Sequence, residues 1–344
     1  MTGNEALAEG AIRAGCQCYF GYPITPQNEL TAYMARHMVE RGRVFVQAES
    51  ELAAIYMVFG AAAAGARCLT TSSSPGISLK QEGISYLAGA EVPAVLANIQ
   101  RGGPGLGGIE PAQADYFQAT RGGGHGDYRT LVLAPDSVQE MHDFPAWAFE
   151  LAERYRNPVM ILSDGLLGQM MEPVILREEV TPAFLDAPWT LTGAADRPPN
   201  VVRSLLIKEG ELERHNLHLQ EKYALAAARE SRAEETETTD ADLLVTAWGS
   251  CARIARGAVA RARSKGLAVG WFRPITLWPF PSDQLIKAAR HARAVLVVEM
   301  NAGQMAEDVR LAIEGRVPVS FKGYLGSRIP RETELLHEME RLLS

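Results

Sequence analysis

Cysteine is scarce in this chain of 344 residues, which contains only Cys16, Cys18, Cys68 and Cys251. Four thiols in a sequence of this length are too few for the disulfide framework of a small secreted protein. None of them belongs to a Cys-x-x-Cys pair, whereas iron–sulfur clusters are held by sets of closely spaced thiolates. Cys16 and Cys18 lie in an apolar run typical of a strand, where buried structural cysteines are common. The sequence therefore predicts that this chain carries no cluster.

Concentrated positive charge and long apolar runs are also missing. The net charge is −7 and no long basic run occurs. We therefore expect neither nucleic acid nor an anionic membrane as a main partner, because both select a concentrated positive surface. The longest apolar stretches, such as 51–66, are rich in Ala and Gly and shorter than the ~20 residues of a membrane-spanning helix. The first residues contain neither the basic nor the apolar segment of a signal peptide, and we expect a cytoplasmic protein.

The residues that are abundant suit two α/β domains. The length and a hydrophobic fraction of 47% suffice for two packed cores. Short β-rich runs alternate with helical stretches over 1–185 and again over 241–344, and this alternation predicts parallel sheets covered by helices. Between them, prolines and charged residues predict an extended linker at 186–240 that contains a polar helix. The expected strands are 16–20, 44–46, 68–71, 94–97, 159–162, 243–246, 267–272 and 294–299, and the expected helices are 5–13, 51–65, 137–154, 215–230 and 253–265, with another helix opening at Pro26.

Loops rich in Gly, Pro and polar residues follow the apolar runs of the first domain. Ligands of open parallel sheets bind outside the carboxyl ends of the strands, which is where such loops lie. Each loop alone could be an ordinary turn, since prolines precede helices and glycines adopt positive φ. The run 103–108 is not a dinucleotide fingerprint, because no helix with a suitable acidic residue follows it. Together the loops nevertheless predict one ligand site, and they are 22–26, 49–51, 72–76, 100–105 and 122–127.

An ordered set of motifs runs through nearly the whole chain. The motifs are 2–6, 8–11, 21–26, 49–54, 74–79, 100–104, 125–127, 273–281 and 298–305. In this order they resemble the motifs of the α subunits of 2-oxoacid:ferredoxin oxidoreductases. The resemblance implies an α/β fold with a thiamine diphosphate-binding, pyrimidine-type domain at 1–185 and a smaller domain, like the C-terminal domain of transketolase, at 241–344. It also implies oxidative decarboxylation of a 2-oxo acid to an acyl-CoA, with reduction of ferredoxin.

The same resemblance implies a site that is shared between subunits, with thiamine diphosphate as cofactor and coenzyme A as co-substrate. The half that holds the diphosphate and Mg²⁺ has a Gly-Asp-Gly turn and an Asn-rich segment, whose oxygens suit a hard cation. Here Ser163-Asp164-Gly165 is followed by no Asn-Asn pair, so Asp164 is interpreted as a strand-end turn and no metal ligand is predicted. A β subunit is expected to hold the diphosphate and Mg²⁺. A γ subunit and a δ-type subunit that carries 4Fe–4S clusters are also expected, and the electrons pass to ferredoxin.

Glu51 is the expected catalytic carboxylate, since the second Glu of a Glu-x-Glu run has this role in the family. It would hydrogen-bond the pyrimidine ring and promote its imino tautomer, while the cofactor does the carbanion chemistry. If a helix has begun here, Glu49 and Glu51 do not share a face and only one carboxylate meets the site. If the run is extended, both could point the same way, and the choice rests on the resemblance. Glu49 is otherwise a solvated charge or an anion near a helix start.

Arg101 and Thr25 are the other catalytic residues that the resemblance implies. A guanidinium fork suits the carboxylate of a 2-oxo acid, and Thr25 would donate to the same substrate. The alternatives are a surface arginine paired with an acid, and an N-cap for a helix that begins at Pro26. The other expected contacts are Tyr22, Pro23, Ile24, Ser74, Pro75 and Gly76 for the cofactor, and Gly102, Gly103, Leu106 and His125 for the substrate pocket. A loop histidine such as His125 is, however, most often merely hydrogen-bonded.

The loop after Arg101 indicates which 2-oxo acid is bound. Family members that act on 2-oxoglutarate tend to have Gly-Pro-Ser-Thr-Gly there and an aromatic-Gly-Thr run before His-Gly-Asp. In this chain residues 103–107 read Gly-Pro-Gly-Leu-Gly and 122–124 are all glycine, as in the branched-chain group. The loss of two hydroxyl donors and the gain of Leu106 favour an isopropyl group over a second carboxylate, unless Leu106 faces away and the glycines only shape a turn.

We therefore expect 2-oxoisovalerate as substrate, with 2-oxoglutarate as the alternative. Two further alternatives stay open from the sequence. One is a thiamine enzyme of the E1 or transketolase type that does not use ferredoxin, whose pyrimidine domain would lack the motif at 22–26. The other is a structural chain with a decayed site, which the presence of Glu51, Thr25 and Arg101 disfavours.

Overall fold

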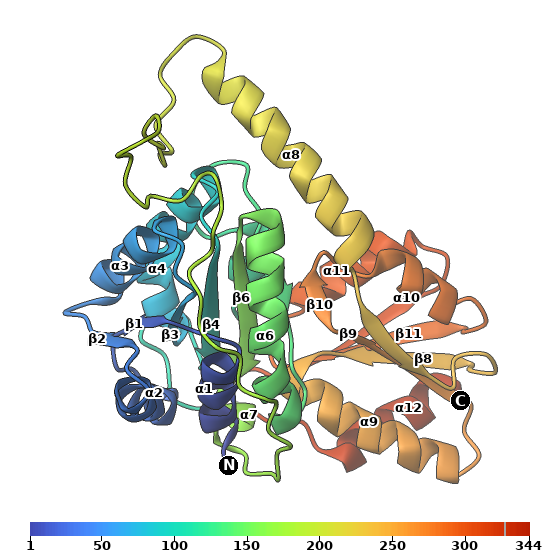
Figure 1. Ribbon diagram of the computed structural model, residues 1–344. Helices are drawn as coiled ribbons and strands as arrows, with labels where there is room; N and C mark the ends of the chain where they lie inside the picture. The colour runs from blue at the N-terminus through green and yellow to red at the C-terminus, as the bar shows by residue number, and fades with distance from the viewer. Residues whose placement is uncertain (327) are drawn as a thin grey trace.

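The computed structural model describes residues 1–326 and 328–344. Within these residues the strands form two sheets. The strand order of the first sheet is β10 (Thr276–Trp278), β5 (Leu131–Leu133), β6 (Pro158–Asp164), β4 (Ala94–Gln100), β3 (Cys68–Ser72), β1 (Cys18–Gly21), β2 (Val44–Gln47). The strand order of the second sheet is β12 (Val319–Gly323), β11 (Ala294–Glu299), β8 (Leu243–Ala247), β9 (Val269–Pro274), β7 (Ala233–Thr236). Figure 1 shows these sheets side by side, each flanked by helices. The predicted α/β fold class, with two sheet domains, is confirmed.

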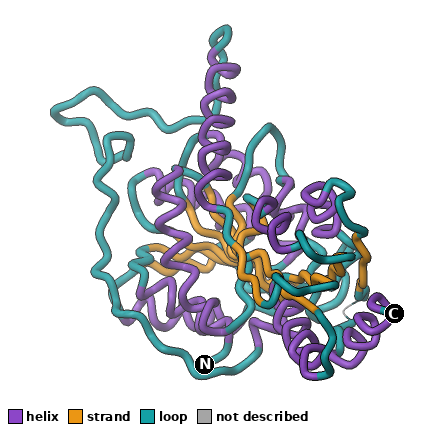
Figure 2. The backbone as a smooth tube through the Cα atoms, turned by 90° about the vertical axis from the view of Figure 1, so that its right-hand side faces the viewer, coloured by secondary structure: helices purple, strands orange, loops and turns teal. Residues whose placement is uncertain are grey.

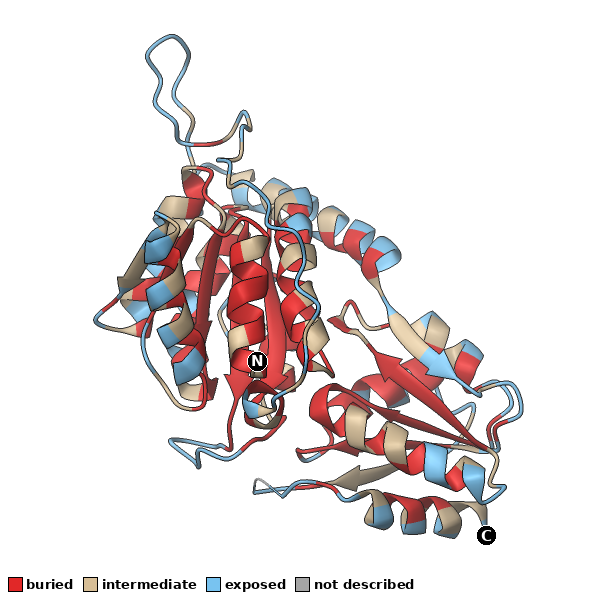
Figure 3. Ribbon diagram, turned by 60° about the horizontal axis from the view of Figure 1, so that its bottom comes forward, coloured by how far each residue is buried: buried red, intermediate tan, exposed pale blue. Residues whose placement is uncertain are grey.

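The first sheet is buried because its central strands are apolar and covered on both faces. Its helices are α1 (Gly3–Arg13), α2 (Asn28–Glu40), α3 (Glu51–Ala63), α4 (Ser74–Gly89), α5 (Tyr116–Arg121), α6 (Val138–Tyr155) and α7 (Gly165–Gln169). Every residue of β3, β4 and β6 is buried, as in other parallel sheets. Val95 belongs to the core under α1 and α6, and Leu96 to the core under α3 and α4, since successive side chains of a strand point to opposite faces. Figure 3 shows these strands buried between helices whose outer sides are exposed.

The second sheet is covered by α9 (Gly249–Ser264), α10 (Ser282–Ala288), α11 (Gln304–Ile313) and α12 (Glu332–Leu343). One face packs against α9 and α12. The core on the other face, under α10 and α11, continues without a break into the core beneath α3 and α4. Tyr116 and Trp248 meet where the two domains join, with ring centroids 5.9 Å apart. The two domains therefore share one hydrophobic core.

The two sheets also exchange edge strands. β10 follows β9 in the chain, yet it pairs antiparallel with β5 of the first sheet. β7 lies in the segment 186–240, which was predicted as a linker, and pairs antiparallel with β9. The polar helix expected at 215–230 is α8 (Glu211–Glu230), which lies across the top of the molecule in Figure 1. The domain limits at 185 and 240 stay a prediction.

Two connections between the domains are visible in the described residues. Residues 172–210 contain neither helix nor strand and run along the outside of the first domain (Figure 2). Arg273, from the 273–281 motif, is 1% exposed and its guanidinium lies 2.7 Å from both Asp136 and Glu140. Burial raises the pKa of Asp136 to about 6, although Arg273 opposes this shift. This arginine therefore joins the two domains.

Pro26 does not open a helix, and this prediction is wrong. The helix α2 begins two residues later, at Asn28, with Gln27 as its N-cap residue. Tertiary contacts hold Thr25 and Pro26 in a turn instead, because Asn4 donates to the carbonyl of Pro26 over 2.8 Å. Thr25 is consequently not the helix cap that was considered as its alternative role. No helix in the described part of the chain is long and apolar enough to cross a membrane.

Candidate functional site

The candidate site lies at the edge of the first sheet where β1, β3 and β4 end. Parallel strands bring their carboxyl ends to one edge, and the registers Ser72↔Asn98 and Gln100↔Asp164 align these ends here. The loop 22–26 follows β1, the start of α4 follows β3, and Arg101 follows β4. The start of α3, with Glu51, reaches the same edge. Residues that are far apart in the sequence thus gather at one place.

Glu51 and not Glu49 is the buried carboxylate. Ser50 caps α3 by accepting a hydrogen bond from the backbone of Ala53, so that Glu51 is the first helical residue. Glu51 is 6% exposed, whereas Glu49 is exposed before the helix begins. Of the two arrangements considered from the sequence, the helical one therefore holds. Within the described residues the carboxylate of Glu51 accepts no hydrogen bond, although it is buried.

The first turn of α4 packs directly against this carboxylate. A Cβ atom on Gly76 would lie 2.6 Å from Oε1 of Glu51 and would overlap Oγ of Ser72. A side chain at position 76 is therefore incompatible with this arrangement. The hydroxyls of Ser72 and Ser73 are buried and have no hydrogen-bond partner among the described residues. Buried polar groups without partners are uncommon in native proteins, and a ligand is one way to satisfy them.

Arg101 extends from the end of β4 across to the loop after β1. Its guanidinium donates to the carbonyl of Thr25 over 3.0 Å and to the carbonyl of Leu106 over 3.3 Å. The residue is 7% exposed, and its Nε is buried without a partner. No carboxylate of the described residues forms an ion pair with it, so the alternative of an arginine paired with an acid does not hold. The structure thus brings Arg101 and Thr25 together and leaves the Nε–H of the guanidinium without a partner.

A network that the sequence did not reveal holds Arg101 in place. Oγ of Ser74 accepts from the backbone N–H of Arg101 over 3.1 Å and donates to Asp115 over 2.6 Å. Asn98 donates to the same carboxylate over 2.9 Å and accepts from the backbone N–H of Ser74. Burial raises the pKa of Asp115, and the hydrogen bonds from Ser74 and Asn98 oppose the shift. An asparagine inside the apolar strand β4 was the one local signal of this network.

The side chain of Gln27 ties the loop after β1 to strand β3. This buried side chain donates to the carbonyl of Tyr22 over 3.3 Å and accepts from Thr71 of β3 over 2.6 Å. Within this loop, Tyr22 and Pro23 are exposed, and Ile24 is half-buried. Gln27 therefore fixes the base of a loop whose apolar residues face solvent at this edge of the sheet. Of the expected cofactor contacts on α4, Ser74 and Gly76 are buried and Pro75 is half-buried.

Two of the expected pocket residues lie apart from the rest or point outward. His125 is exposed, its ring lies edge-on to Tyr86, and its carbonyl accepts from Ser85. These neighbours stand three turns beyond the start of α4, so His125 is not gathered with Glu51 and Arg101. The side chain of Leu106 is 79% exposed, and only its carbonyl contacts Arg101. Gly102 is buried and Gly103 exposed in the same loop.

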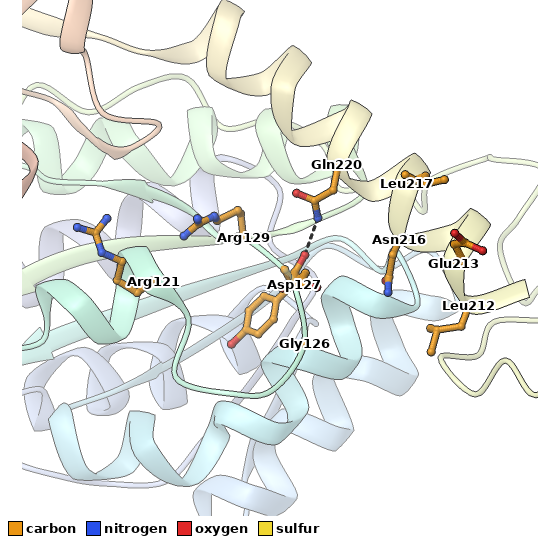
Figure 4. A pocket seen from close by; sticks show the side chains of 10 residues that line it. Arg121, Gly126, Asp127, Arg129, Leu212, Glu213, Asn216, Leu217 and Gln220 are labelled. Atoms are coloured by element: carbon orange, nitrogen blue, oxygen red, sulfur yellow. Dashed lines mark hydrogen bonds between the residues drawn. The ribbon is translucent and has the colours of Figure 1, made fainter. Parts of the chain in front are cut away.

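A large cavity lies elsewhere. Its volume is about 740 Å³, and it lies between the loop 121–129 and α8 (Figure 4). Gln220 of α8 donates to the carbonyl of Asp127 over 2.8 Å and closes one side of it. Neither Glu51 nor Arg101 lines this cavity.

Asp164 and the cysteines have structural roles. Asp164 ends β6, caps α7 through the N–H groups of Leu166 and Leu167, and accepts from Ser250 of α9 over 2.6 Å. Burial raises its pKa, and these hydrogen bonds oppose the shift. All four cysteines are buried, and burial raises the pKa of Cys16 to about 12. No group of three or more His, Cys, Asp or Glu residues in 1–326 and 328–344 could hold a metal ion.

The residues at the sheet edge fit thiamine diphosphate on three counts. They provide a buried carboxylate without a hydrogen bond, unpartnered hydroxyls at the end of β3, and a close approach of backbone at Gly76. These features suit the polar edge of a flat ring that lies against the helix. Nothing comparable in this part of the chain suits a diphosphate with its metal ion.

Known protein families and structures point in the same direction. The family described as pyruvate flavodoxin/ferredoxin oxidoreductase, thiamine diphosphate-binding, matches residues 9–238, and pyruvate:ferredoxin oxidoreductase core domain II matches residues 241–335. The chain is 54% identical to the ketoisovalerate oxidoreductase subunit VorB of Methanothermobacter thermautotrophicus, over 99% of this chain and 97% of that subunit. It is 38% identical to the 2-oxoglutarate synthase subunit KorA of the same organism, over 98% and 96%.

A solved structure also matches the whole chain. It is the 2-oxoglutarate:ferredoxin oxidoreductase from Magnetococcus marinus with 2-oxoglutarate, coenzyme A and succinyl-CoA bound. The TM-score is 0.86 at 26% sequence identity, and the match covers 100% of this chain and 65% of that chain.

Proposed function

We propose, since the chain belongs to the 2-oxoacid:ferredoxin oxidoreductase family, that it is the subunit carrying the aminopyrimidine half of the thiamine diphosphate site. In this proposal the enzyme oxidises 2-oxoisovalerate to an acyl-CoA and reduces ferredoxin. The observation that carries the proposal is the buried, unbonded carboxylate of Glu51 against Gly76. Thiamine diphosphate, when bound, supplies the carbanion chemistry.

Glu51 would hold the pyrimidine ring by a hydrogen bond and exchange a proton with it. A buried carboxylate that accepts no other hydrogen bond is available for this bond, and α3 keeps it rigid. Tyr22, Pro23 and Ile24 would cover the ring on one side, with Ser74, Pro75 and Gly76 on the other. The hydroxyls of Ser72 and Ser73 would gain the partners that they lack in the chain alone.

Arg101 and Thr25 would hold the carboxylate of the 2-oxo acid. The free Nε–H of Arg101 and its fixed neighbours make a planar donor of the kind that suits carboxylates. The network of Ser74, Asn98 and Asp115 orients the backbone of Arg101 and so the direction of its side chain. Residues 102–106 would border the rest of the substrate, and His125 would join them only if a partner subunit or a bound substrate moved its loop.

The branched-chain substrate is favoured by two independent observations. The chain shares more identity with a ketoisovalerate oxidoreductase subunit than with a 2-oxoglutarate synthase subunit, 54% against 38% over similar lengths. The loop 103–107 has no hydroxyl donor for a second carboxylate, although the side chain of Leu106 points outward and does not contribute to this preference. The named alternative is 2-oxoglutarate.

The proposed partner subunits supply the binding groups for the diphosphate, Mg²⁺ and the clusters, which this chain is not proposed to bind. A β subunit would bind the diphosphate and Mg²⁺, because Asp164 is already committed to α7 and Ser250. Further subunits with 4Fe–4S clusters would carry electrons to ferredoxin, because the four cysteines are buried and none belongs to a Cys-x-x-Cys pair. Coenzyme A would accept the acyl group.

The test is an assay of the chain assembled with its partner subunits. We expect reduction of ferredoxin with 2-oxoisovalerate and coenzyme A, and a higher kcat/KM for 2-oxoisovalerate than for 2-oxoglutarate. The chain alone should bind thiamine diphosphate poorly in calorimetry, with or without Mg²⁺. A preference for 2-oxoglutarate would overturn the substrate, and tight Mg²⁺-dependent binding by the chain alone would overturn the division of the site.

A further inference from the structure

Lys80 of α4 is a fully buried cation that the proposed function does not use. Its exposed fraction is 0%. Its Nζ donates to Oγ1 of Thr70 over 2.6 Å and to the carbonyl of Thr71 over 3.0 Å, both of which are neutral. No carboxylate of the described residues lies within ion-pair distance of it. A buried ammonium without a paired charge is costly, so this lysine calls for a physical explanation.

The position of Lys80 relates it to Glu51. It stands one helical turn after Gly76, and residues four apart lie on the same face of a helix. The backbone of Gly76 abuts the carboxylate of Glu51. The two acceptors of Lys80 directly precede Ser72, which borders the same carboxylate. The ammonium therefore lies beneath the candidate site, on the side of the sheet where Glu51 is buried.

The other ionisable groups around α4 are accounted for. Tyr19 of β1 bonds to Thr71, and burial raises the pKa of its hydroxyl, which therefore stays neutral. Asp115, beside the first turn of α4, is bound by Ser74 and Asn98. Burial lowers the pKa of Lys80 to about 7, and the charge of Glu51 acts in the opposite direction.

We propose that Lys80 is the counter-charge of Glu51, a positioning residue that holds the direction of this carboxylate in the candidate site. The catalytic consequence rests on the proposed function, whereas the pairing of the two charges does not. Lys80 does not touch substrate or cofactor in this proposal and acts only through Glu51. Because its pKa lies near 7, the counter-charge is lost as the pH rises through neutrality.

The pairing is tested on the full chain without cofactor. Titration of lysine ε-carbons by NMR, with Lys80 assigned by its absence in Lys80→Met, gives the pKa of Lys80. In Glu51→Gln this pKa should fall by about one to three units, the size expected on losing a nearby opposite charge. The matched control is Glu49→Gln, which removes an exposed charge two residues away and should leave Lys80 unchanged. An unchanged value in Glu51→Gln would overturn the proposal.

A second measurement covers the case in which Glu51→Gln does not fold. Lys80→Met should shift the infrared band of the Glu51 carboxylate, while Lys222→Met, which removes a lysine of α8 that is paired with Glu91, should not. Equal signals in both variants would overturn the pairing.

The assembled enzyme supplies the catalytic readout. Lys80→Met should remove the inflection near pH 7 from the profile of kcat/KM, and Lys222→Met should keep it. An inflection that survives in Lys80→Met contradicts the positioning role. Failure of the proposed function gives a different result, because Glu51→Gln would then turn over normally while the titration of Lys80 still shifted.

Discussion

Two buried glutamates, Glu51 at the start of α3 and Glu299 at the end of β11, have opposite surroundings. Glu299 ends β11 and accepts hydrogen bonds from Trp248, Asn301 and the backbone N–H groups of Met305 and Ala306. Its carboxylate thereby caps α11. Glu51 accepts no hydrogen bond among the described residues and lies near the unpartnered hydroxyl of Ser72.

The difference distinguishes a carboxylate that stabilises the fold from the one that we propose binds the cofactor. Both glutamates lie in motifs by which the chain resembles its family, so the motifs alone do not distinguish them. A carboxylate whose hydrogen bonds are complete stabilises the fold, since removing one partner leaves buried groups unsatisfied. A buried carboxylate that accepts no hydrogen bond within the chain is available to a group from outside the chain.

The largest effect expected from this comparison is on turnover. Glu51→Gln keeps the shape of the side chain but removes its acid–base function, which is typically worth ~10²–10⁴-fold. We expect kcat of the assembled enzyme to fall within that range, with an unchanged melting temperature. Glu49→Gln is the control and should be much milder. A greater loss in Glu49→Gln would mean that the wrong carboxylate has been assigned.

A smaller kinetic effect is expected at Arg101. Arg101→Lys keeps the charge but loses the planar fork and the bonds to Thr25 and Leu106, and hydrogen bonds to charged groups contribute about 1.5–3 kcal/mol. We expect kcat/KM for the 2-oxo acid to fall roughly 10- to 100-fold. Arg121→Lys, on α5, is a suitable control and should keep near-normal kinetics. Equal losses in the two variants would contradict a role for Arg101 in holding substrate.

Effects on stability should be larger around Glu299 than around Glu51, the reverse of the effects on turnover. Asn301→Ala removes a donor to Glu299 and should lower the free energy of unfolding by about 1–3 kcal/mol. Ser72→Ala removes a hydroxyl that has no partner in the chain and should leave the stability of the isolated chain unchanged or slightly higher. Urea denaturation of both variants measures this difference. Equal destabilisation would show that the hydroxyl of Ser72 is satisfied after all.

The smallest effect concerns pH. Burial raises the pKa of Glu299 above its ordinary value of 4.5, and its hydrogen bonds oppose the shift. The folded chain therefore binds this proton more tightly than the unfolded chain, so the contribution to stability is complete below pH 4.5 and is lost as the pH rises through the folded pKa. Glu299→Gln should remove this dependence. The difference in unfolding free energy between the wild type and this variant should shrink from pH 4 upward, and a growing difference would contradict the shift.

Much of the fold could be predicted because its signals are local. The alternation of β-rich and helical runs predicted both sheets, and Ser50 followed by an apolar helical run explains why α3 starts at Glu51. The start of α2 could not be predicted from Pro26, because Asn4 and Arg101 hold that turn from other parts of the chain. The positions of β7 and β10 were missed for the same reason, since strand exchange is decided by tertiary packing.

The resemblance predicted the polar residues of the candidate site. It did not predict the side chains that surround and orient them. Glu51, Arg101 and Thr25 belong to recognisable motifs, and the structure gathers them at one edge. Asp115, Asn98 and Lys80 carry no motif, and their roles depend on which side chains meet across the sheet. For Leu106 and His125, sequence position gave no indication of the direction of the side chain.

The exchange of β7 and β10 decides how the chain can be divided. A cut near residue 240 would remove the strand that covers the edge of β5 and would open the core that α10 and α11 share with α3 and α4. An uncovered edge strand invites pairing with other chains. Fusion, fission or shuffling of this subunit in an engineered enzyme therefore has to keep residues 233–278 with both sheets, and the two halves are not interchangeable modules.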